Sequence, residues 1–156
     1  MSVEAVRAHF RKWNIEDRIQ EFDVSSATVE KAAEALHCEE KRIAKTLAFL
    51  VNDAAILVVM AGDAKVDNRK FKAFFHTKAV MLTPDQVIEM VGHPVGGVCP
   101  FGIKEGVKVY LDDSLKRFET VFPACGSGNS AIELTISELE KYSGYCEWVN
   151  VSKGWE

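Results

Sequence analysis

The first part of the chain carries apolar residues at the spacing of helix faces. One amphipathic helix is expected after Ser2, with an apolar face made of Val3, Val6, Phe10 and Trp13. A second helix follows hydroxyl side chains that suit an N-cap, and its apolar face consists of Val29, Ala32, Ala33 and Leu36. Between the two helices, Arg18 to Phe22 is predicted to form a short strand.

Two strands are expected next, Ile43 to Val51 and Ala55 to Ala61, joined through Asn52-Asp53. The second strand has no polar alternation, which is typical of a strand covered on both faces. In the first strand, Lys45 shares its face with apolar residues, because side chains alternate between faces. Lys45 then either extends its ammonium group to solvent from the strand's end or stands in a cleft and binds an anion.

The middle of the chain predicts one short helix, one strand and one capping box. Asp67 can cap a helix that runs to Phe75, with Phe71, Phe74 and Phe75 facing inward. Ala79 to Leu82 is a strand candidate. The run Thr83-Pro84-Asp85-Gln86 has the pattern of a capping box with proline at the first helical position.

The second half of the chain alternates glycine-rich loops with short strands. Strands are expected at 107–111, 120–122, 131–134 and 146–149. Ser137 and Glu140 suggest a capping box for a last helix that ends near Gly144. Mixed strands and helices without a regular βαβ rhythm favour a single α+β domain over residues 1–156, with a sheet or partial barrel and helices outside it.

The segment from Gly92 to Gly102 combines four glycines and two prolines with apolar residues. Glycine lets a ligand approach the backbone closely, whereas proline stiffens the chain. The segment is therefore interpreted as an ordered, partly buried loop. Composition alone leaves two alternatives open, a loop shaped around a ligand and a tight structural connection.

Charge, hydrophobicity and cysteine spacing argue against several classes of protein. The formal net charge of −4 argues against wrapping long nucleic acid, and no apolar run is long enough to span a bilayer. The N-terminal residues lack the apolar core of a signal peptide, so a cytoplasmic protein with four reduced cysteines is expected. No spacing of cysteine and histidine matches a zinc site, and we expect neither metal nor cofactor.

A local excess of positive charge lies on the predicted helix after Asp67 and just before it. Its basic residues are Lys65, Arg69, Lys70 and Lys72. Such a group is either a solvated helix face or a surface for phosphates, to which lysine and arginine bind without reading sequence.

Common catalytic motifs are absent from the sequence. Neither glycine loop continues as a phosphate-binding loop or a dinucleotide fingerprint. Cys99 and His93 can form a nucleophile–base pair in principle, but a small buried thiol is the simpler role for Cys99. Ser127 and Ser130 lack the context of a hydrolase nucleophile. Residue chemistry alone thus leaves a function undefined.

Three segments resemble the YbaK/ProX/EbsC family, free-standing relatives of the editing domain of bacterial prolyl-tRNA synthetases. They are Ile43-Ala44-Lys45-Thr46-Leu47, the loop from Val95 to Gly102, and Cys125 to Ser130 before Ile132-Glu133-Leu134. The resemblance implies a mixed, largely antiparallel, barrel-like sheet flanked by helices. It also implies hydrolysis of mischarged aminoacyl-tRNA in trans, with tRNA(Pro) carrying cysteine, alanine or another small amino acid as substrate.

The resemblance implies roles for particular residues. Lys45 would anchor the substrate, and Gly96 and Gly97 would hold the aminoacyl or oxyanion group. The aminoacyl pocket would be shaped by Phe22, Thr46, His93, Val98, Cys99, Gly126, Ser127, Gly128, Asn129 and Ser130. The basic residues from Lys65 to Lys72 would touch the acceptor end of the tRNA.

The sequence departs from the cysteinyl-tRNA type of the family at Phe22, Cys99 and Ala131, which leaves the amino acid open. A prolyl-tRNA synthetase or another synthetase is a further expected partner, and the protein is expected to be a monomer or weak homodimer. The alternatives are a non-catalytic module that binds tRNA ends or a synthetase, and an esterase of small molecules.

Overall fold

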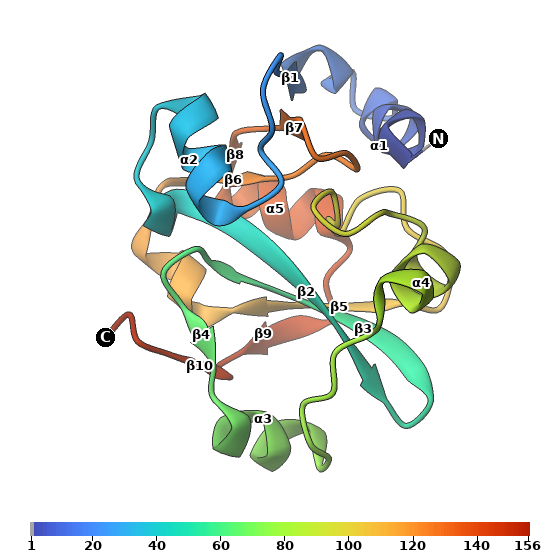
Figure 1. The fold of residues 1–156 in the computed structure, drawn as a ribbon, viewed down its shortest axis with the longest axis vertical. Helices are drawn as coiled ribbons and strands as arrows, with labels where there is room; N and C mark the ends of the chain where they lie inside the picture. Colours follow the sequence, from blue (N-terminus) through green and yellow to red (C-terminus); the bar gives the residue numbers. More distant parts are fainter. Residues whose placement is uncertain (1) are drawn as a thin grey trace.

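The β2–β3 hairpin forms the centre of a curled six-stranded sheet in the computed structural model, which describes residues 2–156 (Figure 1). In sheet order, the strands are β8 (Leu134–Thr135), β6 (Thr120–Pro123), β2 (Ile43–Val51), β3 (Ala54–Ala61), β5 (Lys108–Asp112) and β9 (Glu147–Val149). The turn residues Asn52 and Asp53 both have positive φ, as the two central residues of a type I′ hairpin turn require.

Two further small sheets complete the strand pairing. One joins β1 (Gln20–Glu21) to β7 (Ser130–Ala131), and the other joins β4 (Lys65–Val66) to β10 (Ser152–Lys153). Among the described residues, four strand pairs are antiparallel and three are parallel. The expected mixed, largely antiparallel α+β architecture is therefore confirmed.

Helices cover both faces of the sheet (Figure 1). The α-helices are α1 (Ser2–Arg11), α2 (Val29–Leu36), α3 (Asn68–Phe75), α4 (Pro84–Gln86) and α5 (Ile136–Ser143). Short helical turns are η1 (Glu16–Arg18), η2 (Glu40–Arg42), η3 (Val87–Val91) and η4 (Asp113–Arg117). Thr28 caps α2, Asp67 caps α3, and Thr83 forms the expected capping box with Gln86.

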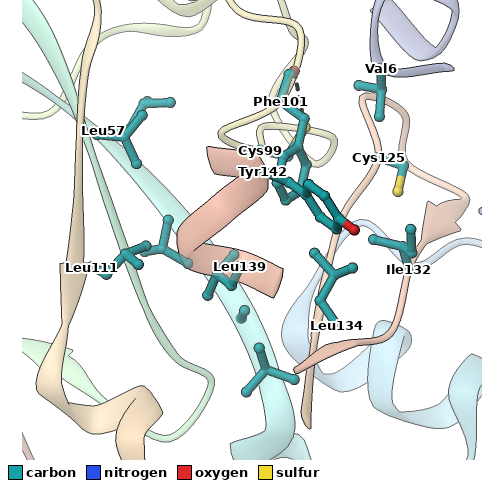
Figure 2. Packing of buried hydrophobic residues seen from close by; sticks show 14 of the residues in the cluster. Val6, Leu57, Cys99, Phe101, Leu111, Cys125, Ile132, Leu134, Leu139 and Tyr142 are labelled. Atoms are coloured by element: carbon teal, nitrogen blue, oxygen red, sulfur yellow. Dashed lines mark hydrogen bonds between the residues drawn. The ribbon is translucent and has the colours of Figure 1, made fainter. Parts of the chain in front are cut away.

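The hydrophobic core lies on both faces of β3, as its lack of polar alternation predicts. Leu57 faces the larger cluster, in which Leu111, Leu139 and Tyr142 pack together (Figure 2). Val58 faces the second cluster, which includes aromatic residues of α3. Because both faces are covered, β2 and β3 form a rigid platform for the site described below.

Five local predictions are wrong. The strand expected at 79–82 is not formed, and this segment meets β2 only at an isolated bridge between Met81 and Phe49. Residues 16–18 form η1, so only Gln20–Glu21 of the strand expected at 18–22 pairs in a sheet. The strand expected at 131–134 is divided, because the chain leaves its pairing with β1 and joins β6 only from Leu134. The capping box of α5 uses Thr135 and Glu138 rather than Ser137 and Glu140, so the helix begins earlier. Phe74 is 38% exposed, whereas Phe71 and Phe75 are buried.

Among residues 2–156, no helix combines the length and the apolar character needed to cross a bilayer.

Candidate functional site

A pocket of about 470 Å³ opens beside the first half of β2. Its walls come from α2 and the segment before it, from the chain around α4, and from both glycine loops. In Figure 1, α2 lies at the left, near the start of β2, and α4 lies at the right. The lining residues are Ser26, Ala27, Thr28, Val29, Ala32, Ile43, Ala44, Lys45, Thr46, Leu47, Ala48, Met81, Leu82, Pro84, Val87, Val95, Gly96, Val98, Phe122, Ala124, Ser130 and Ala131.

The pocket is mostly aliphatic and contains little ionisable chemistry. Among the lining residues that the structure describes, Lys45 is the only one with a titratable side chain. A ligand here would meet apolar walls and a few polar groups, which is the usual composition of a small-molecule site. A side-chain carboxylate, imidazole or thiol does not contribute to the described lining.

Lys45 is half-buried, and its ammonium group bonds to two backbone carbonyls. Its Nζ donates to the oxygen of Ala64 and, at 3.4 Å, to the oxygen of Gly62. Burial lowers the pKa of Lys45, nearby Asp63 acts in the opposite direction, and Lys65 lowers the pKa further. An ammonium group has three donors, so one N–H remains for an anionic or carbonyl ligand at the edge of the pocket.

The turn that holds Lys45 is itself fixed by close packing. The backbone N–H of Ala61 donates to Oγ of Ser114 at 3.0 Å, and Ser114 is fully buried. A Cβ on Gly62 would lie 2.0 Å from the carbonyl oxygen of Glu40, so only glycine fits there. The ammonium group of Lys45 is thus held by a rigid backbone rather than by a flexible ion pair.

Two hydroxyl groups in the pocket wall lack partners. Oγ of Ser26 and Oγ1 of Thr46 are buried, and neither has a hydrogen-bond partner among the described residues. A buried hydroxyl without a partner costs about 1–3 kcal/mol.

The Gly96-Gly97 pair forms a tight turn at the pocket wall. The N–H of Gly97 donates to the oxygen of Pro94 at 3.0 Å, and Gly96 has φ +94°, as the third position of a type II turn requires. The N–H of Gly97 is therefore occupied. The N–H groups of Gly96 and Val98 have no acceptor within residues 2–156 and remain available to a ligand.

The second glycine loop supports the pocket rather than lining most of it. The N–H of Gly126 donates to the oxygen of Gly97 at 2.9 Å, and a Cβ on Gly97 would lie 2.5 Å from the nitrogen of Ser127. The oxygen of Gly128 accepts from the N–H of Ser26, and Asn129 pairs with the backbone of Phe22. Of residues 126–130, only Ser130 reaches the pocket, and its hydroxyl bonds to Ser127.

His93 and Cys99 lie in the core, away from the pocket lining. Both are fully buried, and Nε2 of His93 lies 2.7 Å from the oxygen of Phe101 and 3.6 Å from Sγ of Cys99. Burial lowers the pKa of His93 and raises the pKa of the Cys99 thiol to about 12. A thiol with such a pKa is a poor nucleophile at neutral pH. The pocket lining therefore excludes His93 and Cys99. It also excludes Phe22 and Gly97, two further residues that were expected to contact the substrate.

The basic residues proposed for tRNA contact do not act alike. Lys70 is half-buried and donates to the oxygen of Ser152 at 2.8 Å, so it fastens the C-terminal segment to α3. Lys65, Arg69 and Lys72 are exposed and form no ion pair within the described chain. Among residues 2–156, no three His, Cys, Asp or Glu side chains gather where they could hold a metal ion.

Much of the pocket wall comes from segments that the sequence did not predict to lie at a site. Ser26, Ala27 and Val29 precede or begin α2, and Met81 to Val87 come from the chain that crosses to α4. The hydroxyl cluster before α2 and the capping box at Thr83 mark these segments as ordered. Neither signal says that they face the same strand.

A family model described as an aminoacyl-tRNA editing domain matches residues 23–142 of this chain. The chain is similar to the uncharacterized protein YwhH of Bacillus subtilis (strain 168), with 55% identity over the full length of both. It is also similar to the proline–tRNA ligase of the same organism, with 30% identity over 65% of this chain. That match spans only 18% of the ligase.

A solved structure of a candidate trans-editing enzyme for prolyl tRNA synthetase superimposes with a TM-score of 0.87. The two sequences are 26% identical, and the match covers 98% of each chain. The matched family model covers the pocket's β2 strand and both glycine loops. This chain belongs to the aminoacyl-tRNA editing domain family.

Proposed function

We propose that the protein is a deacylase that hydrolyses the ester of mischarged aminoacyl-tRNA in trans. The substrate is tRNA(Pro) that carries cysteine, alanine or another small amino acid, and the site is the pocket beside β2. The observation that carries this proposal is the carbonyl-bound ammonium of Lys45 at the edge of an apolar pocket with unpaired polar groups. Similarity to a candidate trans-editing enzyme supports the assignment.

The proposed reaction needs orientation more than a strong nucleophile. An aminoacyl ester is already labile, and its hydrolysis is accelerated by holding the ester and stabilising the developing oxyanion. The free N–H groups of Gly96 and Val98 are donors of the required kind. Water or a group of the substrate attacks the ester carbon, and the tRNA hydroxyl leaves with the proton.

Lys45 anchors the substrate in this proposal. Its remaining N–H binds a phosphate or hydroxyl of the terminal nucleotide, while the aliphatic walls accept the amino acid side chain. Lys65, Arg69 and Lys72 touch the acceptor end. A synthetase remains a proposed partner, and we expect the protein to act as a monomer or weak homodimer.

A deacylation panel tests the function. Wild type and Lys45→Ala are given tRNA(Pro) charged with Cys, Ala, Ser, Thr or Pro, together with each cognate pair. We expect selective cleavage of one mischarged species and a loss of about 100-fold or more in the variant. Binding of tRNA without hydrolysis of any species would instead favour a non-catalytic module.

A further inference from the structure

The edge of β2 is interrupted where it borders the pocket. Pairing of β2 with β6 ends at Ala44, which lies opposite Pro123. On the same side, pairing resumes at Ala48, whose oxygen accepts from the N–H of Leu82 at 3.0 Å. Between these two points, β2 has β3 on one side and the pocket on the other.

The direction of the backbone groups in this gap follows from their neighbours. Leu50 donates to the oxygen of Val80, so Leu50 and Ala48 point away from β3. Backbone groups in an antiparallel strand alternate between its two sides. Thr46 therefore also presents its N–H and C=O away from β3, toward the gap.

Three backbone groups remain unpaired along this edge. The N–H and C=O of Thr46 and the N–H of Ala48 have no partner within residues 2–156. Thr46 and Ala48 both line the pocket. Backbone polar groups in folded proteins are nearly always paired, so an open run of donor and acceptor groups at a pocket wall marks a place where a ligand can bind.

We propose that the gap in β2 binds the aminoacyl group as a single added strand residue. The α-amino group donates to the C=O of Thr46, and the ester carbonyl accepts from the N–H of Ala48. In parallel pairing, one residue of the added strand bonds to residues two apart in its neighbour, which fits this spacing. The contact is a one-residue form of strand addition to a sheet edge.

This arrangement separates two kinds of recognition. The backbone of β2 binds the α-amino and carbonyl groups that all aminoacyl esters share, whereas the aliphatic walls contact the side chain. The bond to the ester carbonyl also strengthens as negative charge develops on that oxygen. Because the oxygen of Ala48 already accepts from the N–H of Leu82 on this same edge, the N–H of Ala48 is positioned before the substrate arrives.

The inference rests on the proposed deacylase function and can be tested separately from it. Three esters of tRNA(Pro) are compared, with alanine, with lactic acid and with propionic acid, each rate being normalised to uncatalysed hydrolysis. Lactate keeps a neutral donor at the α-position, and propionate has none. We expect the alanyl and lactyl esters to be cleaved at similar normalised rates and the propionyl ester about tenfold or more slowly.

The possible outcomes are distinct. Equal normalised rates for all three esters would overturn strand-like binding while leaving the deacylase function intact. If the lactyl ester were cleaved as slowly as the propionyl ester, the positive charge of the α-amino group would be what is recognised, which also contradicts the proposal. Failure to cleave alanyl-tRNA and every other ester of the panel would instead remove the proposed function.

A backbone substitution tests the protein's side of the contact. Ala48 is replaced by its α-hydroxy analogue, which turns the N–H into an ester oxygen and keeps the methyl side chain. We expect kcat/KM to fall about ten- to a hundredfold while the melting temperature falls less than in the control below, because the N–H of Ala48 has no partner within the protein and only the Leu47 carbonyl, which faces β3, becomes a weaker acceptor. The same replacement at Ala61 is the matched control, since its N–H donates to Ser114 and its loss should lower the melting temperature. Full activity of the Ala48 analogue would overturn the proposal.

Discussion

The pocket beside β2 and the buried cluster around Cys99 have opposite chemical characters. The cluster contains a thiol and an imidazole 3.6 Å apart, yet both are fully buried and outside the pocket lining. The pocket contains one lysine, two hydroxyl groups without partners and several unpaired backbone groups. In the site that we propose, unpaired backbone groups therefore contribute more than reactive side-chain types.

After loss of the Lys45 ammonium group, the next largest effect on activity is expected from a change in the glycine turn of the pocket wall. Gly96→Ala adds a side chain at φ +94° and places its Cβ 3.0 Å from Cβ of Ala27. Strain at such a position costs about 1–3 kcal/mol, and the turn that presents the N–H groups of Gly96 and Val98 shifts. We expect kcat/KM to fall about ten- to a hundredfold, measured by deacylation. Unchanged turnover would remove this turn from the mechanism.

A substitution at Cys99, in the buried cluster, should affect stability rather than turnover. Cys99→Ala removes a buried sulfur that packs in the larger core cluster. We expect the free energy of unfolding to fall by about 1–3 kcal/mol, measured by denaturant titration, with kcat within about threefold of wild type. A folded Cys99→Ala protein without activity would show that the thiol takes part in the reaction.

The smallest expected effect is on the pH dependence of folding stability. Burial lowers the pKa of His93 in the folded protein, so the unfolded chain binds a proton more readily. The stability that this residue contributes is complete above the ordinary histidine pKa of about 6.5 and is lost as the pH falls toward the lowered value. His93→Gln should flatten the loss of stability between about pH 7.5 and 5 without moving the pH profile of kcat. The check is a series of thermal melts, and a shifted kcat profile would contradict a structural role.

The sequence allowed the central platform to be predicted because its signals are local. The β2–β3 hairpin follows from two apolar runs around Asn52-Asp53, and the phase of β2 places Lys45 on an apolar face. For Lys45 the sequence left two alternatives, extension to solvent or anion binding in a cleft. In the structure its ammonium group binds carbonyls of the turn after β3 and also borders the pocket. That turn reaches Lys45 only through the pairing of the two strands.

The rest of the site depends on contacts between remote segments. The gap in β2 exists because β6 stops pairing at Ala44 and the 80–82 segment begins at Ala48, and neither limit has a local signal. The role of Gly97 is another example. Its nitrogen looks available in the sequence, but the Pro94 turn occupies it and Ser127 packs against it.

The most direct test compares one variant from each region on the same substrate. The deacylation rate of the best-cleaved mischarged tRNA is measured for wild type, for Lys45→Ala, and for Cys99→Ala combined with His93→Gln. We expect a rate within about threefold of wild type for the folded cluster variant and a loss of about 100-fold or more for Lys45→Ala. The reverse pattern would move the chemistry from the pocket to the buried cluster and contradict the account.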